Sequence, residues 1–296
     1  MISHTVCPLC SSGLTGQYLK CTDNLLTKEE YDIYRCNSCG FVFTNGYPEE
    51  ENIGRYYDSG DYISHEDSAK GTVNRIYILA REIMLRRKKQ LIQKMTGLEN
   101  GSLLDIGCGT GHFAGMMKKS GWDVTGIEPG TKAREYGIQK FGIRVVHPSE
   151  ISELPDRSYD CITLWHVMEH FHDPSGYAVE MRRLLKPGGK CIVALPNCNS
   201  SDADFFREHW AAWDVPRLLW HFNPDTFRRF AEKEGFSIDK TMVLPLDVFY
   251  ISILSFRNKG SGIPLIRGIV MGKLFFLKSL FRKEKGSSLI YVLHMN

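Results

Sequence analysis

The stretch Leu103-Leu104-Asp105-Ile106-Gly107-Cys108-Gly109-Thr110-Gly111 decides the fold of this chain. Its first half is apolar, as in a buried strand, and a helical pattern of apolar residues follows it. Glycine is needed where the backbone turns sharply and lies against a ligand, because glycine has no Cβ atom. In open parallel sheets such ligands bind at the carboxyl ends of strands, where the strand order reverses. The stretch therefore predicts a strand, a ligand-binding loop and a helix.

Short apolar runs alternate with helical patterns on both sides of this stretch. This β-α-β-α rhythm predicts an α/β fold, with a parallel sheet covered by helices on both faces. The tight turn Lys186-Pro187-Gly188-Gly189 is expected to start one of the strands. We predict strands at Ser102–Cys108, Asp123–Glu128, Arg144–His147, Tyr159–Val167, Lys190–Pro196, Ser237–Val243 and Ser288–His294, and helices at Thr72–Thr96, Gly111–Ser120, Thr131–Phe141, Pro174–Leu185 and Pro224–Glu234.

The strand after the glycine-rich stretch ends in an acidic residue, Glu128. A carboxylate at this point can accept hydrogen bonds from the two hydroxyls of a ribose, as in dinucleotide-binding folds. An alternative cofactor is NAD, because the run 109–114 matches the GxGxxA pattern and Glu128 follows at about the spacing of an NAD-binding fold. Asp105 before the loop and the additional glycine Gly107 speak against NAD.

Three segments together resemble class I S-adenosylmethionine (SAM)-dependent methyltransferases. LLDIGCGTGHFAGMMKKSGWDVTGIEP (103–129) is similar to the SAM-binding region of that family, LPDRSYDCITLWHVMEHFHDP (154–174) to its fourth-strand region, and LLKPGGKCIVALPN (184–197) to its turn into the fifth strand. The resemblance covers about residues 100–247 and the last strand. It implies a Rossmann-like, seven-stranded sheet whose last strand is antiparallel.

The resemblance also implies a set of cofactor contacts. Asp105, Gly107 and Gly109 would contact the methionine end of SAM, Glu128 the ribose, and Pro129 the adenine. Glu150 matches the acidic adenine contact by its spacing before Leu154-Pro155, although the local sequence departs from the usual Gly-Asp. The predicted cofactor residues are Asp105, Gly107, Cys108, Gly109, Gly111, Glu128, Pro129, Glu150 and His166.

Two CxxC pairs near the N-terminus, Cys7-Pro8-Leu9-Cys10 and Cys36-Asn37-Ser38-Cys39, predict a metal site. Two residues between thiolates let both reach one tetrahedral ion, and two such turns complete a closed, structural Cys₄ zinc shell. A redox-active pair and an iron–sulfur cluster are alternatives. We expect three parts: a zinc ribbon at 1–45, a linker and helical lid at 46–97, and the methyltransferase domain at 98–296 with a helical insertion at 255–286.

Composition limits the compartment and the partners. The chain has 296 residues, 43% hydrophobic, 24% charged, with a formal net charge of +3, which is too small to predict a nucleic-acid partner. Nine cysteines, four of them in CxxC pairs, fit a reducing compartment better than a disulfide framework. We recognise neither a signal peptide nor a membrane-spanning run, and therefore expect a cytoplasmic protein.

Three histidines are candidate general bases for an oxygen or carbon acceptor: His166, His209 and His221. Methyl transfer needs an aligned acceptor and, for such acceptors, removal of a proton, for which histidine is suited near neutral pH. His166 is expected at the end of the fourth strand, near the reacting methyl group. Its alternative role is to pack against the adenosine or to cap the loop.

An aromatic segment at 208–224, EHWAAWDVPRLLWHFNP, is the candidate acceptor site. Aromatic faces suit sugar or ring substrates, and a guanidinium can hold a phosphate or carboxylate. The alternative is a tryptophan-rich packing loop. Tyrosines of the linker are candidates for a lid over the site. The predicted substrate-binding residues are Tyr57, Tyr62, Trp210, Trp213 and Arg217.

The segment GIPLIRGIVMGKLFFLKSLFRKEKG (262–286) is apolar and basic. An interfacial helix has this composition, as does a helix over the substrate site or at a dimer contact. Peripheral contact with the inner face of a membrane is therefore one expectation, and a lipid-linked acceptor would accompany it. The sequence leaves the oligomeric state open.

The first functional hypothesis is a SAM-dependent methyltransferase acting on a small-molecule, sugar or lipid-linked glycan acceptor. Some sugar C-methyltransferases carry a similar N-terminal zinc module, but they also carry a further C-terminal domain for which this chain looks too short. The alternatives are an NAD-dependent oxidoreductase and a non-catalytic zinc and SAM-fold binding module.

Overall fold

A computed structural model describes residues 1–57 and 72–296 of the chain, with side chains from residue 81 onward in the second range. Its main element is a seven-stranded sheet with the strand order β10-β11-β8-β7-β4-β5-β6. The strands are β4 (Ser102–Ile106), β5 (Asp123–Ile127), β6 (Arg144–Val146), β7 (Tyr159–Trp165), β8 (Leu185–Pro196), β10 (Phe236–Val243) and β11 (Ser288–Met295).

The strand directions confirm the predicted fold class. β4 pairs in parallel with β5 and β7, β5 with β6, and β7 with β8. β11 is antiparallel to both of its neighbours, β8 and β10. The central strands carry continuous apolar runs because helices cover both faces of a parallel sheet, and Leu103, Leu104 and Ile162 are accordingly fully buried.

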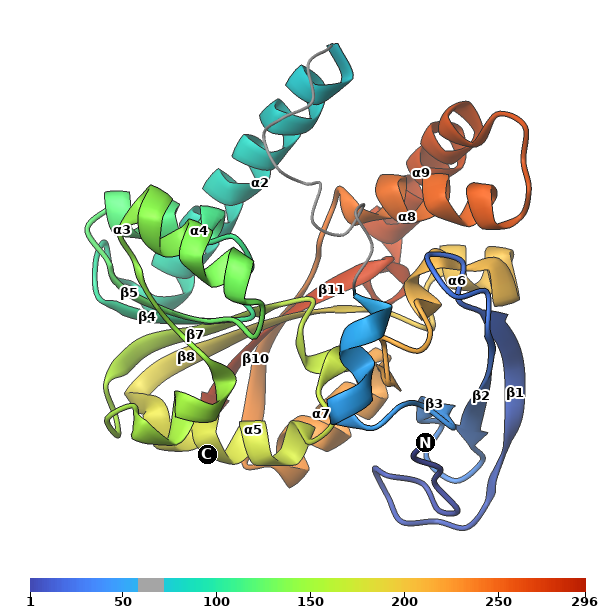
Figure 1. Cartoon of the computed structure of the whole chain (residues 1–296), viewed down its shortest axis with the longest axis horizontal. Helices are drawn as coiled ribbons and strands as arrows, with labels where there is room; N and C mark the ends of the chain where they lie inside the picture. Colours follow the sequence, from blue (N-terminus) through green and yellow to red (C-terminus); the bar gives the residue numbers. More distant parts are fainter. Residues whose placement is uncertain (58–71) are drawn as a thin grey trace.

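Helices pack on both faces of this sheet (Figure 1). One face carries helices whose side chains Ile92, Phe113 and Met117 form one core with the strands. The opposite face carries helices that contribute Met181 and Phe227 to a second core. The first group is α2 (Thr72–Thr96), α3 (His112–Lys119) and α4 (Thr131–Phe141), and the second is α5 (Pro174–Leu184) and α7 (Pro224–Lys233).

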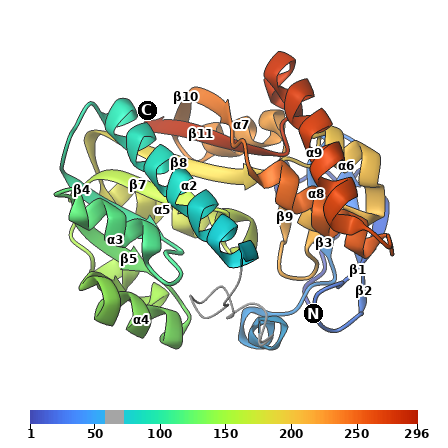
Figure 2. The same cartoon turned by 90° about the horizontal axis from the view of Figure 1, so that it is seen from above.

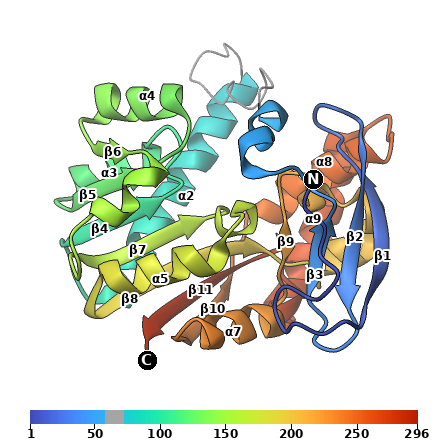
Figure 3. The ribbon, with the colours of Figure 1, turned by 60° about the horizontal axis from the view of Figure 1, so that its bottom comes forward.

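A second, four-stranded antiparallel sheet has the order β1-β2-β3-β9 and stands beside the first (Figure 3). Three of its strands come from the N-terminal region: β1 (Thr15–Thr22), β2 (Glu30–Cys36) and β3 (Val42–Asn45). The fourth, β9 (Trp220–His221), comes from the aromatic segment after β8. The N-terminal ribbon is therefore joined to the main domain by strand pairing.

A helical hairpin lies between β10 and β11 in the sequence, and consists of α8 (Asp247–Asn258) and α9 (Pro264–Phe281). It lies at the opposite end of the molecule from α3 and α4 (Figure 2). The hairpin shares a core with the N-terminal sheet and with α6 (Ser201–Phe206), because Ile33, Phe206 and Phe275 belong to one buried cluster. Short 3-10 helices are η1 (Glu50–Tyr56), η2 (Pro148–Glu153), η3 (Met168–His170), η4 (Arg207–His209), η5 (Ala211–Trp213) and η6 (Lys283–Lys285).

The structure differs from the predicted elements at several points. β8 begins at Leu185, and its pairing with β7 is irregular across the predicted turn at 186–189. The helical insertion begins at Asp247, earlier than the predicted 255. The linker contains η1 where no regular structure is expected. None of the described helices combines the length and the apolar character needed to cross a membrane.

Candidate cofactor and acceptor site

The glycine-rich loop lies at the carboxyl edge of β4, between Asp105 and α3. Gly107 has φ 70°, and a Cβ atom at this position would overlap the side chain of Val167. Gly109 has φ 55°, and a Cβ atom there would meet no atom within 4 Å. Gly107 is therefore required for close packing against the loop after β7. Gly109 leaves its backbone uncovered, and its predicted contact with a ligand stays a prediction.

Glu128 lies directly after β5 and its carboxylate faces the same loop. Its Oε2 accepts a hydrogen bond from the Gly109 N–H at 3.0 Å, and its Oε1 accepts one from the Gly130 N–H at 2.9 Å. Burial raises the pKa of Glu128, and these hydrogen bonds act in the opposite direction. A carboxylate has about four lone-pair sites, so both oxygens retain capacity for ribose hydroxyls.

Asp105 is the second-to-last residue of β4, directly before the loop, and its side chain is buried. Its Oδ1 accepts a hydrogen bond from the Thr163 hydroxyl on β7 at 2.6 Å. Burial raises the pKa of Asp105 to about 6. The charge of Lys88 on α2 acts in the opposite direction on the pKa of Asp105. The Nζ of Lys88 lies 4.2 Å from the ring centroid of Trp165, and burial lowers the pKa of this lysine. The carboxyl edge of β4 and β7 thus combines one buried acid with one cation.

The remaining predicted cofactor residues surround the loop. Cys108 packs its sulfur against Gly126, and a Cβ atom on Gly111 would lie 2.8 Å from Ile143. Pro129 follows Glu128, and its carbonyl accepts a hydrogen bond from Arg134. Glu150 is the third residue of η2, where it completes a capping box by accepting the His147 N–H on its Oε1 at 2.9 Å. These placements are compatible with the predicted cofactor contacts, which stay predictions.

His166 follows β7 with φ 58° and lies between two carboxylates. Its Nε2 lies 2.7 Å from Oδ2 of Asp247, and its Nδ1 lies 3.4 Å from Oε1 of Glu169. Burial lowers the pKa of His166, but the charges of Asp247 and Glu169 outweigh this effect and raise the pKa to about 10. His166 is therefore an imidazolium at neutral pH. This state does not fit its predicted role as a general base.

Comparison with known proteins identifies the domain that contains this site. The model of a family described as a methyltransferase domain matches residues 80–241, more than half of the chain. The chain belongs to this methyltransferase-domain family. It is 31% identical over 121 residues to a ubiquinone biosynthesis O-methyltransferase of Photorhabdus laumondii, covering 38% of this chain and 50% of the relative. The same enzyme of Paracidovorax citrulli is 32% identical over 117 residues, covering 37% and 49%. The chain thus spans about half the length of these curated relatives.

Solved structures share the fold of the methyltransferase domain at low identity. Magnesium protoporphyrin IX methyltransferase from Synechocystis aligns with a TM-score of 0.55 at 12% identity, covering 84% of this chain and 100% of that chain. Geranyl diphosphate C-methyltransferase from Streptomyces coelicolor aligns with a TM-score of 0.54 at 14% identity, covering 85% and 99%. Both structures were solved with bound S-adenosylhomocysteine, and neither they nor the relatives support the NAD alternative.

The aromatic segment of the methyltransferase domain does not form the predicted acceptor pocket. Trp210 and Trp213 are 2% exposed and pack edge-to-face on each other. Arg217 is 1% exposed, and its Nη2 lies 2.7 Å from carboxylate oxygens of both Asp23 and Asp214. These side chains are occupied within the protein, so we replace their predicted substrate role with a structural one: they hold the N-terminal sheet against the methyltransferase domain.

Two of the three candidate bases lie away from the cofactor loop. His221 belongs to β9, where its Nε2 lies 3.0 Å from the Thr44 hydroxyl, and burial lowers its pKa to about 3. It is a neutral interior histidine of the four-stranded sheet. His209 lies in η4 and contacts Glu208 at 3.7 Å. The structure brings only His166 to the carboxyl edge of β7, so the base assignments of His209 and His221 have no geometric support.

Of the two linker tyrosines predicted to bind the substrate, the structure describes one. The hydroxyl of Tyr57 lies 2.9 Å from Nδ1 of His170, in the loop after β7. Tyr62 lies outside the described residues. The linker thus reaches the loop that carries His166, and the substrate role of Tyr57 stays a prediction.

Asp247, Lys88 and Glu169 are three groups near the site that the sequence did not single out for a role. Asp247 begins α8, which follows β10, so only the fold brings it to His166. Lys88 is one of many basic residues along α2, and no local pattern distinguishes it. Glu169 is 1% exposed, and within the described part of the chain neither of its carboxylate oxygens accepts a hydrogen bond.

The four predicted zinc ligands converge at the base of the N-terminal sheet. Their sulfur atoms all lie within 4.8 Å of one another, and the Cys7–Cys39 and Cys10–Cys36 pairs are 3.7 Å apart. A tetrahedral ion with Zn–S bonds of about 2.3 Å requires sulfur separations of about 3.8 Å. The set therefore fits a Cys₄ zinc shell, and Phe41 packs beside it in the same buried cluster.

Proposed function

We propose that the protein transfers a methyl group from SAM to a small-molecule acceptor. The observation that carries the proposal is the open loop at Gly109, bounded by Asp105 and Glu128 at the carboxyl edge of β4 and β5. Bound SAM supplies an activated methyl group, so the protein needs no covalent intermediate of its own. Membership of the methyltransferase-domain family supports the same reading.

The residues of this edge match the charges of SAM. Glu128 would accept hydrogen bonds from the ribose hydroxyls, and Asp105 would face the positively charged methionine end. Lys88 interacts electrostatically with Asp105, and its ammonium group would suit the carboxylate of the same methionine moiety. Each of these three side chains comes from a different element, and the sheet fixes their relative positions.

His166 is assigned a positioning role in this proposal. Because Asp247 and Glu169 hold it as an imidazolium, it connects the loop after β7 to α8 and fixes both at the carboxyl edge of the sheet. A proton leaving an oxygen acceptor would have to reach a different group. Glu169 is the adjacent buried carboxylate, and we propose it as the proton acceptor.

The acceptor is proposed as a small molecule with a hydroxyl group. The two relatives above carry the name O-methyltransferase, which supports oxygen as the first acceptor atom to test. The burial of Trp210 and Trp213 removes the argument that exposed aromatic faces bind a sugar ring. A lipid-linked hydroxyl compound is a second acceptor class to test, because helix α9 of the hairpin exposes apolar side chains.

The N-terminal cysteines are proposed to bind a structural zinc ion. The sulfur separations support this, and a closed Cys₄ shell leaves no coordination position for a substrate. The ion would stabilise the N-terminal sheet, in which β3 pairs with β9 of the methyltransferase domain.

Calorimetric titration of the full chain with SAM, S-adenosylhomocysteine and NAD tests the cofactor. We expect micromolar binding of the first two and none of NAD, and the reverse pattern would overturn the proposal. Transfer of labelled methyl to a panel of phenolic, sugar and lipid-linked hydroxyl compounds then tests the reaction. If the protein binds SAM but transfers methyl neither to any of these compounds nor to components of water-soluble extracts, the non-catalytic binding module would be favoured.

A further inference from the structure

Helix α9 exposes an apolar face that runs along most of its length. Large apolar side chains that are 43% to 89% exposed include Leu265, Ile266, Ile269, Val270, Leu277 and Phe281. Their spacing of three, four and seven residues places them on one side of the helix. Soluble proteins seldom expose a continuous apolar surface of this kind without a partner.

The opposite side of α9 is already used for packing against α8. A Cβ atom on Gly268 would overlap Ile253, and one on Gly272 would lie 3.0 Å from the ring of Phe249. Phe275 is buried on this side, next to α6 and α8. The hairpin is therefore held by its glycine side, which leaves the apolar face of α9 directed away from the protein core.

The charges around the apolar face are almost all positive. Within Pro264–Phe281 there is no acidic residue, while Arg267, Lys273 and Lys278 are basic. Arg282 follows the helix directly. An apolar helix face flanked by cations is complementary to an anionic lipid surface, where acyl chains lie beneath negatively charged headgroups.

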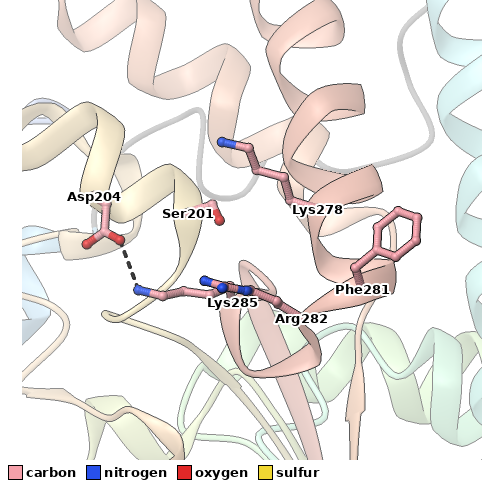
Figure 4. Close-up of a pocket in the computed structure, with 6 residues that line it drawn as sticks. All are labelled: Ser201, Asp204, Lys278, Phe281, Arg282 and Lys285. Carbon is pink, nitrogen blue, oxygen red and sulfur yellow. Dashed lines mark hydrogen bonds and ion pairs between the residues drawn. The ribbon is translucent and has the colours of Figure 1, made fainter.

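A cavity of about 420 Å³ at the end of α9 extends this complementarity, and Figure 4 shows its lining residues. Lys278, Arg282 and Lys285 reach toward Ser201 and Asp204 of α6. Lys285 is engaged, because its Nζ lies 2.9 Å from Asp204. Among the described residues, no carboxylate lies within ion-pair distance of Lys278 or Arg282, and Phe281 at the cavity rim is 89% exposed.

We propose that α9 docks the protein onto an anionic lipid surface, with its apolar face in the boundary layer and with Lys278 and Arg282 on lipid phosphates. A second copy of this chain is the less suitable occupant, because a twofold contact through the same face would set cations against cations. The inference does not depend on methyltransferase activity.

The hairpin that carries this face is connected to the candidate site. Its first helix, α8, begins at Asp247, whose carboxylate contacts His166 at the carboxyl edge of β7.

Co-sedimentation of the full chain with vesicles tests the proposal. We expect binding to vesicles of phosphatidylcholine mixed with phosphatidylglycerol, little binding to phosphatidylcholine alone, and weaker binding as salt rises. The double variant Lys278→Glu/Arg282→Glu should bind about 25-fold more weakly or worse, because each cation near such a surface contributes a factor of about five. Phe281→Glu should lose about tenfold or more.

Matched controls lie on the far side of the molecule. Lys119→Glu/Lys132→Glu on α3 and α4 makes the same charge change at exposed positions, and Val179→Glu on α5 replaces another exposed apolar residue. Both should bind like the unaltered chain. Equal binding to both vesicle types, binding to neither, or equal losses in the controls would overturn the proposal. A further outcome would also overturn the proposal: the unaltered chain does not bind vesicles but forms a dimer in solution, and Phe281→Glu converts that dimer to a monomer.

Discussion

His166 and Asp247 form an ion pair across 81 residues of sequence, with Nε2 of the histidine 2.7 Å from Oδ2 of the aspartate. The histidine directly follows β7 and the aspartate begins α8. The pair therefore joins the core of the methyltransferase domain to the helical hairpin. It also fixes the protonation state of a residue at the candidate site.

The first prediction is that His166 titrates far above neutral pH. Its pKa in the folded protein is raised to about 10 from an ordinary value of 6.5, while the pKa of Asp247 is lowered by the same partner. The raised pKa of His166 stabilises the folded protein fully when the pH is below the pKa of the unfolded state. This stabilisation is lost as the pH rises through the pKa of the folded state. NMR titration of the imidazole should show no transition near neutrality.

Thermal unfolding checks the same prediction by a second route. Between about pH 7 and pH 10 the midpoint should fall more in the unaltered protein than in His166→Gln, which lacks the titrating group. His294→Gln is the control, since His294 contacts Asp239 at 2.7 Å on the surface, away from α8. An imidazole transition near 6.5 would contradict the assignment and restore His166 as a candidate base.

The second prediction concerns Glu128 and SAM. Glu128→Ala should lower SAM affinity by about 10- to 100-fold, because hydrogen bonds to a charged group contribute about 1.5–3 kcal/mol each. Glu128→Gln keeps the size of the side chain and should also bind SAM weakly, with a thermal midpoint close to that of the unaltered protein. Glu135→Ala, on the exposed side of α4, is the control. Unchanged calorimetric affinity in Glu128→Ala would remove the ribose contact.

The core of the fold and the cofactor loop could be predicted from local sequence. Helices α2 and α4 have the predicted limits, because the apolar spacing that defines each helix is contained within it. The buried strands follow from continuous apolar runs, and the loop from its glycines. Each of these signals lies within about 25 residues of sequence, where backbone periodicity is directly visible.

The role of the aromatic segment at 208–224 could not be predicted in the same way, because the residues that it contacts are distant in sequence. Thr44 and Leu218 are hydrogen-bonded across 174 residues, and Arg217 and Asp23 across 194. Tryptophan and arginine are common in binding pockets and in buried contacts between sheets alike, and composition does not separate these two uses. The role of Asp247 could not be predicted for the same reason, because nothing in the sequence around it indicates that it contacts His166.

The third prediction assigns Arg217 to stability. The guanidinium is buried with Asp23, and Asp214 provides a second carboxylate. Arg217→Met keeps most of the volume but leaves Asp23 without its counter-charge, so the free energy of unfolding should fall by about 3–5 kcal/mol. Denaturant unfolding measures this loss. Arg228→Met, which removes an exposed partner of Asp225, should cost less than about 1 kcal/mol. Loss of acceptor binding in Arg217→Met without loss of stability would return Arg217 to the substrate site.

The last prediction concerns the Cys₄ site. The unaltered protein should contain about one zinc ion per chain, and Cys36→Ser should lose it, because three thiolates leave the tetrahedral shell open. Metal analysis by mass spectrometry measures the content. Cys198→Ser removes a thiol that contacts the His221 carbonyl outside the cluster, and should retain zinc.

Loss of the ion should spread beyond the ribbon. β9 pairs with β3, and residues of β1 and β2 share a buried cluster with Trp213 and Phe275. Hydrogen exchange in Cys36→Ser should therefore accelerate in β1, β2, β3 and β9 and, to a smaller degree, in α6 and α8. The strands β4, β5 and β7 share one cluster with Cys7 and Cys36, but their other face packs on α2 and α3 in a second core. These strands should therefore lose the least protection, and SAM affinity should be retained. Full zinc content in Cys36→Ser would contradict the Cys₄ assignment, and equal acceleration of exchange in both sheets would contradict the support of β4, β5 and β7 by the second core.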